Sequence, residues 1–325
     1  MKKKKNIFVL NKLIILFLVL LILFSSAIFL IEKNHNKSNI LLGVKMNYGA
    51  YSKEDFEWLA ENFGYLSLNY YQKEFAQVVR EHNPDIFMTM ELAMGCNIIN
   101  NDHSVCINNG KEIREEYYIH DKKGDRIEDK GTKGTDWKIY MLDYCNPEVR
   151  SYAVRTAIDK LNDAKVFDGI SVDPSYFNEY YYENNPDCLA KFFQELSFEC
   201  HKYGYLNIPN LPGAFEFNLI DKFMPYIDGM HEEAFYYGWD GLPRNSSEIE
   251  KQFEIAKTFG NKNKIYIAGL FLHYDLWKKD LNNAIKPVYD RFSSFNKGTY
   301  IIYASTLGYY DWWNAKHVAP AYREF

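Results

Sequence analysis

The chain has 325 residues, of which 47% are hydrophobic and 17% aromatic, and its formal net charge is −5. This composition excludes an intrinsically disordered chain and offers no basic face for nucleic acid. It leaves enough apolar material for one large packed domain, and we expect no nucleic-acid partner.

The N-terminus combines a run of lysines at residues 2–5 with a segment, residues 13–31, that contains no charged residue. A stretch of that length spans a bilayer core as a helix, and cationic flanks stay on the cytoplasmic side. The sequence therefore predicts a basic tip, a membrane anchor and a short linker over residues 1–38, with the rest of the chain outside the cytoplasm. A cleaved signal peptide, which would leave a secreted protein, is the alternative.

Beyond the predicted anchor, short apolar runs alternate with amphipathic segments, as in folds that alternate strands and helices. Eight repeats of this kind are typical of a (β/α)8 TIM barrel, which needs about 250 residues. We therefore expect an α/β chain with one barrel over residues 39–325, preceded by the transmembrane or signal-anchor helix. The candidate strands are 40–48, 65–71, 85–94, 168–173, 205–209, 229–235, 264–271 and 299–305.

A polar stretch at residues 96–138 separates the third candidate strand from the fourth. It is too hydrophilic for a core and too long for an ordinary strand-to-helix loop, so we expect an insertion over the barrel mouth. Cys96 and Cys106 lie in it and would form a disulfide in an oxidising compartment. The five cysteines show no zinc-ligand spacing, and neither a metal nor a cofactor is predicted.

Two candidate strands end in the pattern Asp-Gly-x-x-x-acid. DGISVD ends at Asp173 of the fourth strand, and DGMHEE ends at Glu233 of the sixth. Because side chains alternate along a strand, each acid points to the same side as its glycine. Reactive groups of TIM barrels lie at the carboxyl ends of the strands. With one strand between them, Asp173 and Glu233 are expected to face each other across the mouth.

Two carboxyl groups so placed fit the hydrolysis of a glycosidic bond. One is ionised and attacks or stabilises the anomeric carbon, and the other is protonated and donates to the leaving oxygen. A separation of about 5 Å would predict retention and about 6.5 to 9.5 Å inversion. The alternative is that each acid only caps a helix or binds a backbone amide. The sequence lacks GxxxxGK[ST], HExxH and GxSxG, the usual motifs of nucleotide hydrolases, zinc proteases and serine hydrolases.

The run LDYCNPEVR at residues 142–150, a helix, and then FDGISVD resemble the pattern D-x-x-N-P-x-x-R…F-D-G-x-x-x-D of TIM-barrel glycoside hydrolases. These include the hypothetical glycoside-hydrolase-like family 15 and the endo-α-1,4-polygalactosaminidase-like proteins. DGMHEEAF is similar to their strand D-G-x-x-x-E-x-F. The resemblance covers roughly residues 43–310 as an architecture, with specific motifs in the central third. It implies Asp173 as nucleophile and Glu233 as acid/base.

Other polar and aromatic residues lie at or just beyond the strand ends. Glu91 is either a substrate contact, a third carboxylate that shifts the pKa of a neighbour, or a buried acid satisfied by backbone groups or tyrosine hydroxyls. Asp143 either binds sugar or caps the next helix. Amides and hydroxyls suit sugar hydroxyl groups and tryptophans stack on sugar rings, although each such residue also serves in packing. These candidates are Asn69, Tyr70, Asn207, Asn210, Tyr303 and Tyr309, with Trp137, Trp239, Trp312 and Trp313.

The leading hypothesis is a membrane-anchored glycosidase that cleaves an extracytoplasmic polysaccharide or oligosaccharide without a cofactor. Glu232 is expected to point away from Glu233, and His231 is expected to be a core histidine. The alternatives are a non-catalytic glycan-binding barrel at the cell surface, or a lyase or transglycosylase that uses the same acids. A buried salt bridge to either acid, or a separation above about 12 Å, would count against hydrolysis by this pair.

Overall fold

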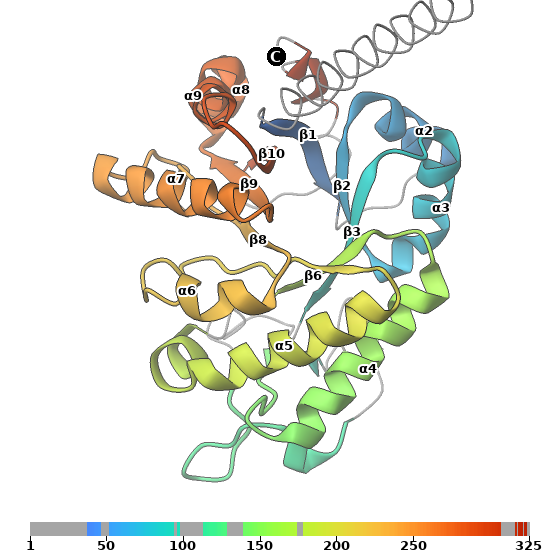
Figure 1. Cartoon of the computed structure of the whole chain (residues 1–325), viewed down its shortest axis with the longest axis vertical. Coiled ribbons are helices and arrows are strands. Elements are labelled where there is room, and N and C mark those ends of the chain that lie inside the picture. The colour runs from blue at the N-terminus through green and yellow to red at the C-terminus, as the bar shows by residue number, and fades with distance from the viewer. Residues whose placement is uncertain are drawn as a thin grey trace, which may run out of the picture.

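Eight parallel strands form a barrel in the computed structural model of the chain (Figure 1). Their order around the barrel is β7-β6-β3-β2-β1-β10-β9-β8. The two outer strands meet where the backbone N–H of His231 donates to the carbonyl of Pro209 at 2.9 Å and that of Leu211 donates to the carbonyl of His231 at 2.8 Å. These bonds close the barrel. The structure describes residues 38–46, 52–93, 96–97, 113–128, 139–173, 178–306, 316, 318–320 and 322–323.

The barrel strands lie where the sequence predicts them, and the predicted (β/α)8 fold is confirmed. Their ends differ from the predicted ranges by only a few residues, which is the usual uncertainty of a strand boundary. The strands are β1 (Asn39–Met46), β2 (Tyr65–Asn69), β3 (Phe87–Ala93), β6 (Gly169–Asp173), β7 (Leu206–Asn207), β8 (Gly229–Glu232), β9 (Ile265–Leu272) and β10 (Thr299–Thr306).

Helices follow the strands and surround the barrel (Figure 1). Side chains at their first residues fix where several begin: the Ser52 hydroxyl accepts from the backbone N–H of Asp55, and Asn146 caps the helix that starts at Pro147. The α-helices are α2 (Lys53–Asn62), α3 (Lys73–His82), α4 (Pro147–Ala164), α5 (Pro186–Lys202), α6 (Ile220–Phe223), α7 (Ser246–Asn261), α8 (Tyr274–Lys279) and α9 (Leu281–Ser293). Shorter turns are η1 (Tyr70–Gln72), η2 (Glu115–Tyr117), the π-helix η4 (Asn178–Asn184) and η5 (Met224–Tyr226).

Glycines make room where neighbouring strands approach inside the barrel. A Cβ atom on Gly169 would lie 2.6 Å from the carbonyl oxygen of Leu206, and one on Gly229 would lie 2.6 Å from that of Ile265. Real Cβ atoms essentially never come so close to backbone. Both D-G-x-x-x-acid segments therefore need glycine at this position.

Apolar side chains fill the lower part of the barrel. Tyr65, Ile208, Ile267 and Ile301 form part of one buried cluster there. A second and larger cluster lies between the strands and the surrounding helices. Above the apolar cluster, near the carboxyl ends of the strands, lie the buried charged side chains of Lys45, Glu91 and Glu233.

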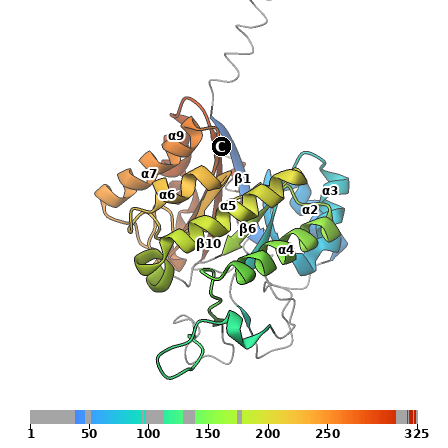
Figure 2. The same cartoon turned by 60° about the horizontal axis from the view of Figure 1, so that its bottom comes forward.

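The predicted insertion follows β3. Its described part contains the two-residue strands β4 (Cys96–Asn97) and β5 (Ile139–Tyr140), which pair antiparallel, and residues 113–128. Figure 2 shows residues 113–128, coloured teal to green, beyond one end of the barrel. Cys106 and Trp137 lie outside the described residues.

The predicted anchor at residues 13–31 also lies outside the described residues. Within the described part of the chain, none of the helices has both the length and the apolar character needed to cross a bilayer. The anchor therefore stays a prediction from the sequence.

Candidate active site

Three charged side chains from three strands meet in the upper part of the barrel. The ammonium of Lys45, on β1, lies 2.5 Å from Oε1 of Glu233 and 2.8 Å from Oε1 of Glu91, which is on β3. Glu233 follows the last residue of β8. All three are buried, and Lys45 is only 2% exposed. The chain thus holds a lysine between two carboxylates at the carboxyl ends of its strands.

Burial and ion pairing act in opposite directions on these groups. Burial alone would raise the pKa of Glu233, but the adjacent Lys45 ammonium lowers the pKa of Glu233 to about 2. Burial alone would lower the pKa of Lys45, but Glu233 and Glu91 raise it well above its usual value. Glu233 is therefore ionised at neutral pH. A proton donor needs the opposite state, and this buried ion pair is the arrangement that counts against a simple acid role.

Asp173 is the last residue of β6, and its side chain is less buried than that of Glu233. Its charge contributes to the raised pKa of Lys45, which places the carboxylate in the same electrostatic environment. The two predicted acids thus end the fourth and sixth strands of the barrel, as the sequence predicts. Their roles in catalysis stay a prediction.

Neutral polar groups complete the layer. His231 Nε2 lies 2.6 Å from the hydroxyl of Tyr303, and burial lowers the pKa of His231 to about 3. Asn210, 1% exposed, lies beside Glu233. Within the described residues, Nδ1 of His231 and the hydroxyls of Ser171 and Ser305 are buried without a hydrogen-bond partner. Buried polar atoms without partners are uncommon, and these three lie on strands that surround the charged layer.

The backbone directly after Glu233 is strained. Ala234 and Tyr236 have φ values of 57° and 65°, in the left-handed region that favours glycine. Arg244 holds this turn by donating from Nε to the carbonyl of Ala234 at 3.1 Å, and Gln252 accepts from the backbone N–H of Tyr236 at 3.0 Å. Strain of this kind persists only where surrounding contacts enforce it, and it is frequent at functional sites.

A groove of about 490 Å³ lies on the loops that follow β7 and β8. Trp239 lines it, is 57% exposed, and packs edge-on against Phe271 of the barrel interior. Glu216, Asp240 and Glu248 line it as well, together with the single cation Arg244 of its described lining. An exposed indole beside polar side chains is suited to stacking against a sugar ring.

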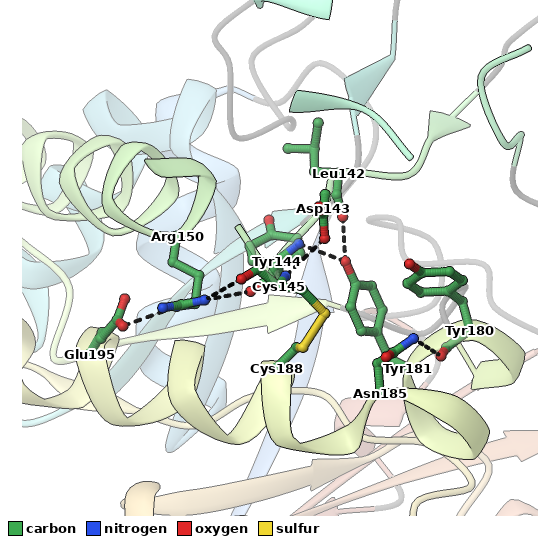
Figure 3. The surroundings of a disulfide bond; sticks show 10 residues. All are labelled: Leu142, Asp143, Tyr144, Cys145, Arg150, Tyr180, Tyr181, Asn185, Cys188 and Glu195. Carbon is green, nitrogen blue, oxygen red and sulfur yellow. Dashed lines mark hydrogen bonds and ion pairs between the residues drawn. A yellow bond between two sulfur atoms is a disulfide. The ribbon is translucent and has the colours of Figure 1, made fainter. Parts of the chain in front are cut away.

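The D-x-x-N-P-x-x-R motif builds a loop and a helix start (Figure 3). Asp143 accepts from the backbone N–H of Cys145 at 3.0 Å, and Asn146 accepts from that of Glu148 at 2.9 Å. Arg150 donates to the carbonyls of Tyr144 and Cys145, each at 3.0 Å. The cap of α4 is therefore Asn146, while Asp143 holds the turn before it. These contacts account for the motif without a ligand.

A disulfide that the sequence did not predict fixes the same loop. Cys145 and Cys188 are joined, 43 residues apart in sequence, and link the start of α4 to the first turn of α5. The hydroxyl of Tyr181 accepts from the backbone N–H of Tyr144 at 2.7 Å beside this bond (Figure 3). The predicted pair Cys96 and Cys106 cannot be compared, since Cys106 and the side chain of Cys96 lie outside the described residues.

Two predicted sugar contacts lie away from the charged layer. Asn207 points out of the barrel toward α5, where its amide donates to the hydroxyl of Ser197 at 3.0 Å, because its position on β7 has the opposite parity to Asn210. Tyr70 donates to Asp163 of α4 at 2.6 Å. These contacts give Asn207 and Tyr70 structural partners away from the charged layer, and their predicted substrate roles are not carried into the proposal below.

The remaining candidates that the structure describes are buried. Asn69 is buried, and its backbone N–H donates to Gln72 at 2.9 Å. Tyr303 is fully buried against His231 and supports the layer from within the barrel. Glu232 points away from Glu233, as expected, and lies 3.4 Å from the backbone N–H of Gly213. Trp137, Tyr309, Trp312 and Trp313 lie outside the described residues.

Lys45 is the central residue that sequence reasoning missed. It stands in the apolar run of the first strand, where a single lysine resembles an exposed strand residue. The available signal was strand parity, because Lys45 is two residues beyond Gly43 and so shares its inward face. A charged residue on the inner face of a barrel strand, near its carboxyl end, belongs to the same layer as the acids.

A scan against protein-family models finds no match, and a search of curated proteins finds no significant relative. Among solved structures, the chain is similar to the glycoside hydrolase domain of PelA from Pseudomonas aeruginosa, with 12% identity, 83% of this chain and 96% of that chain covered, and a TM-score of 0.54. It is also similar to the spore cortex-lytic enzyme SleL of Bacillus megaterium QM B1551 (12% identity, 88% and 74% covered, TM-score 0.51) and to Dispersin B (11% identity, 86% and 97% covered, TM-score 0.51). The predicted resemblance to TIM-barrel glycoside hydrolases is confirmed at the level of the fold.

Proposed function

We propose that this chain is a glycoside hydrolase that cleaves a polysaccharide with Asp173 and Glu233 as its pair of carboxylates. The observation that carries the proposal is the position of these acids at the ends of the fourth and sixth barrel strands, above an apolar interior and around Lys45. Asp173 acts as the nucleophile and Glu233 as the acid/base, as the resemblance implies.

The groove beside the mouth favours a polymer that carries amino groups. Trp239 offers a stacking surface, and Glu216, Asp240 and Glu248 outnumber the one cation of the described lining, Arg244. A protonated amino sugar would therefore meet a net negative wall. The groove volume of about 490 Å³ leaves room for sugar units beyond the one being cleaved.

The barrel domain acts outside the cytoplasm in this proposal, held by residues 13–31 or released after their cleavage. The Cys145–Cys188 bond supports this, because disulfides persist in oxidising compartments. N-terminal sequencing of the mature protein distinguishes the anchored form from the cleaved one. Thiol counting before and after reduction tests the bond, and two reactive thiols at Cys145 and Cys188 in freshly isolated protein would contradict this location.

The test uses the full chain in detergent and measures new reducing ends on soluble glycans. Suitable substrates are a galactosamine polymer, partly deacetylated chitin and a β-1,6-linked glucosamine polymer. Asp173→Asn and Glu233→Gln should each lower kcat/KM by about 100-fold or more, since positioned acids and bases contribute on that scale. Asp159→Asn and Glu74→Gln, exposed acids on α4 and α3, are the matched controls and should leave it unchanged. Wild-type rates in either amide variant would remove the proposed mechanism.

A glycan-binding barrel that does not cut is the second candidate. The Lys45–Glu233 ion pair favours it, because it leaves Glu233 without the proton that a general acid needs. Retention of the polymers above on an affinity column, with no new reducing ends from pH 4 to pH 8, would establish this alternative.

A further inference from the structure

Lys45 contacts two carboxylates, and its charge opposes the protonation that Glu233 would need as an acid. Glu91 and Glu233 lie on either side of it, at 2.8 Å and 2.5 Å. Lys45 is also the strongest influence that lowers the pKa of Glu233 and keeps it ionised, against the effect of burial. If Glu233 is the acid/base of the proposed function, its proton has to arrive after the sugar binds.

Among the residues that the structure describes, the other titratable groups around this layer do not replace Lys45 as a positive charge. His231 is neutral at ordinary pH because burial lowers its pKa to about 3. Burial raises the pKa of Tyr303 well above its usual value and that of Tyr65 to about 12, so both hydroxyls keep their protons. Asp173 adds a further negative charge near Lys45. The charge of Lys45 therefore decides how many of the surrounding carboxylates stay ionised.

We propose that Lys45 is a positioning residue that shifts its ion pair from Glu233 to Glu91 when a sugar enters the mouth, so that Glu233 can take up the proton that it donates. This inference rests on the proposed function and adds a role for two residues that the carboxylate pair alone does not need. Both acceptors are already within ion-pair distance of Lys45 Nζ, so the shift requires only a small movement of one flexible side chain.

Glu91 is essential to this arrangement. A buried ammonium without a partner is costly, so Lys45 cannot release Glu233 unless a second carboxylate holds its charge. Ser67 lies 3.4 Å from the other oxygen of Glu91 and supports it from β2. Binding of a sugar displaces water from the mouth, which favours the neutral form of a carboxyl that is no longer paired.

The proton balance is closed. Glu233 takes a proton from water and gives it to the glycosidic oxygen as that bond breaks and Asp173 bonds to the anomeric carbon. Water then attacks that carbon, the bond to Asp173 breaks, and Glu233 takes a proton from the attacking water. When the product leaves, Glu233 returns this proton to solvent and is again ionised beside Lys45. Lys45 keeps its own protons throughout.

The test compares Lys45→Met with Glu91→Gln in the pH dependence of kcat, whose alkaline limb reports the proton donor in the substrate complex. Lys45→Met removes the cation and should move that limb to higher pH by one unit or more. Glu91→Gln leaves Lys45 with Glu233 alone and should move it to lower pH by one unit or more, with lower kcat at neutral pH. Lys278→Met, an exposed lysine on α8, is the control and should leave the limb in place.

Opposite shifts support the inference, because a purely structural role would lower kcat in both variants without moving the limb in opposite directions. Shifts in the same direction, or a limb that stays in place in both folded variants, overturn it. Carbon-13 titration of glutamate side chains in the unliganded protein, assigned with Glu233→Gln, needs no catalysis. Glu233 should titrate at least one unit higher in Lys45→Met than in the wild type, and an unchanged value overturns the inference. An inactive wild type that passes this titration would refute the proposed function, while the effect of Lys45 on the pKa of Glu233 would stand.

Discussion

The two D-G-x-x-x-acid segments, residues 168–173 and 228–233, use their first halves in the same way. Asp168 accepts from the backbone N–H of Met88 at 2.7 Å, and Asp228 accepts from that of Asn207 at 2.9 Å. Each aspartate thus ties its strand to the strand before it. In each segment the following glycine admits the backbone of the next strand.

Their second halves differ. Asp173 ends β6 and is partly exposed, whereas Glu233 is 6% exposed and paired with Lys45 from the first strand. The repeated pattern therefore sets the backbone, and a residue 188 positions away sets the charge. Equivalent positions in a barrel therefore become chemically distinct through their neighbours across the interior.

Substitution of the two glycines should lower stability more than any other change considered, and it tests whether the first halves of the two segments are equivalent. Gly169→Ala and Gly229→Ala should each lower the free energy of unfolding by about 3 kcal/mol, since each new methyl group would lie against backbone that cannot easily move. Urea unfolding measures this cost. Gly64→Ala is the control and should be nearly neutral, because its Cβ would first meet a side-chain atom of Leu41 at 3.3 Å. Costs that differ by more than about 1 kcal/mol between the two glycines would break the equivalence.

Substitutions of the two acids in the second halves should differ in how much they lower the free energy of unfolding. Glu233→Gln should lower the free energy of unfolding by about 2 kcal/mol, because it removes one of the two carboxylates that hold a buried ammonium. Asp173→Asn should cost about 0.5 kcal/mol or less, as usual for a partly exposed position. Urea unfolding of both variants at pH 7 makes the comparison. An equal cost would mean that Lys45 does not distinguish the two acids.

The layout of the barrel was predictable because it depends on local patterns. The eight apolar runs, the glycines and the two acids follow from strand parity, and the structure has them where expected. Parity also explains why Asn207 points out of the barrel, since its position is one residue out of step with Asn210.

The environment of the site was not predictable because it depends on contacts between distant residues. Lys45 reaches Glu233 only once the barrel closes, and Cys145 meets Cys188 only once α4 and α5 pack together. Sequence spacing suggested a nearer cysteine pair. A list of acids likewise gave no information on which of them would be buried with a cation.

The pH dependence of stability tests the low pKa of Glu233. The pKa of Glu233 is about 2 in the folded protein, below the usual value of about 4.3 in an unfolded chain. Its contribution is therefore present above pH 4.3 and is lost as the pH falls toward 2. Between pH 5 and pH 3 the wild type should lose about 1.5 kcal/mol more stability than Glu233→Gln. Urea titrations at both pH values measure this difference, and parallel losses would place the pKa of Glu233 near its usual value.

The smallest expected effect is the difference in stability cost between substitutions of Asp168 and Asp228, the first residues of the two segments. Asp168 also accepts from the guanidinium of Arg80 at 2.7 Å, while His201 lies 2.9 Å from Asp228. Asp168→Asn should cost about 1.5 kcal/mol and Asp228→Asn about 1 kcal/mol, because both weaken a bond to a backbone N–H and only the first also loses a permanently charged partner. The difference stays near 0.5 kcal/mol because the Arg80–Asp168 pair is partly exposed to solvent. Urea unfolding of both variants measures this difference, with Asp159→Asn as the control at an exposed position. A cost at Asp228 above that at Asp168 would show that the strand-to-strand bond depends on the neighbouring strand more than on the charged partner.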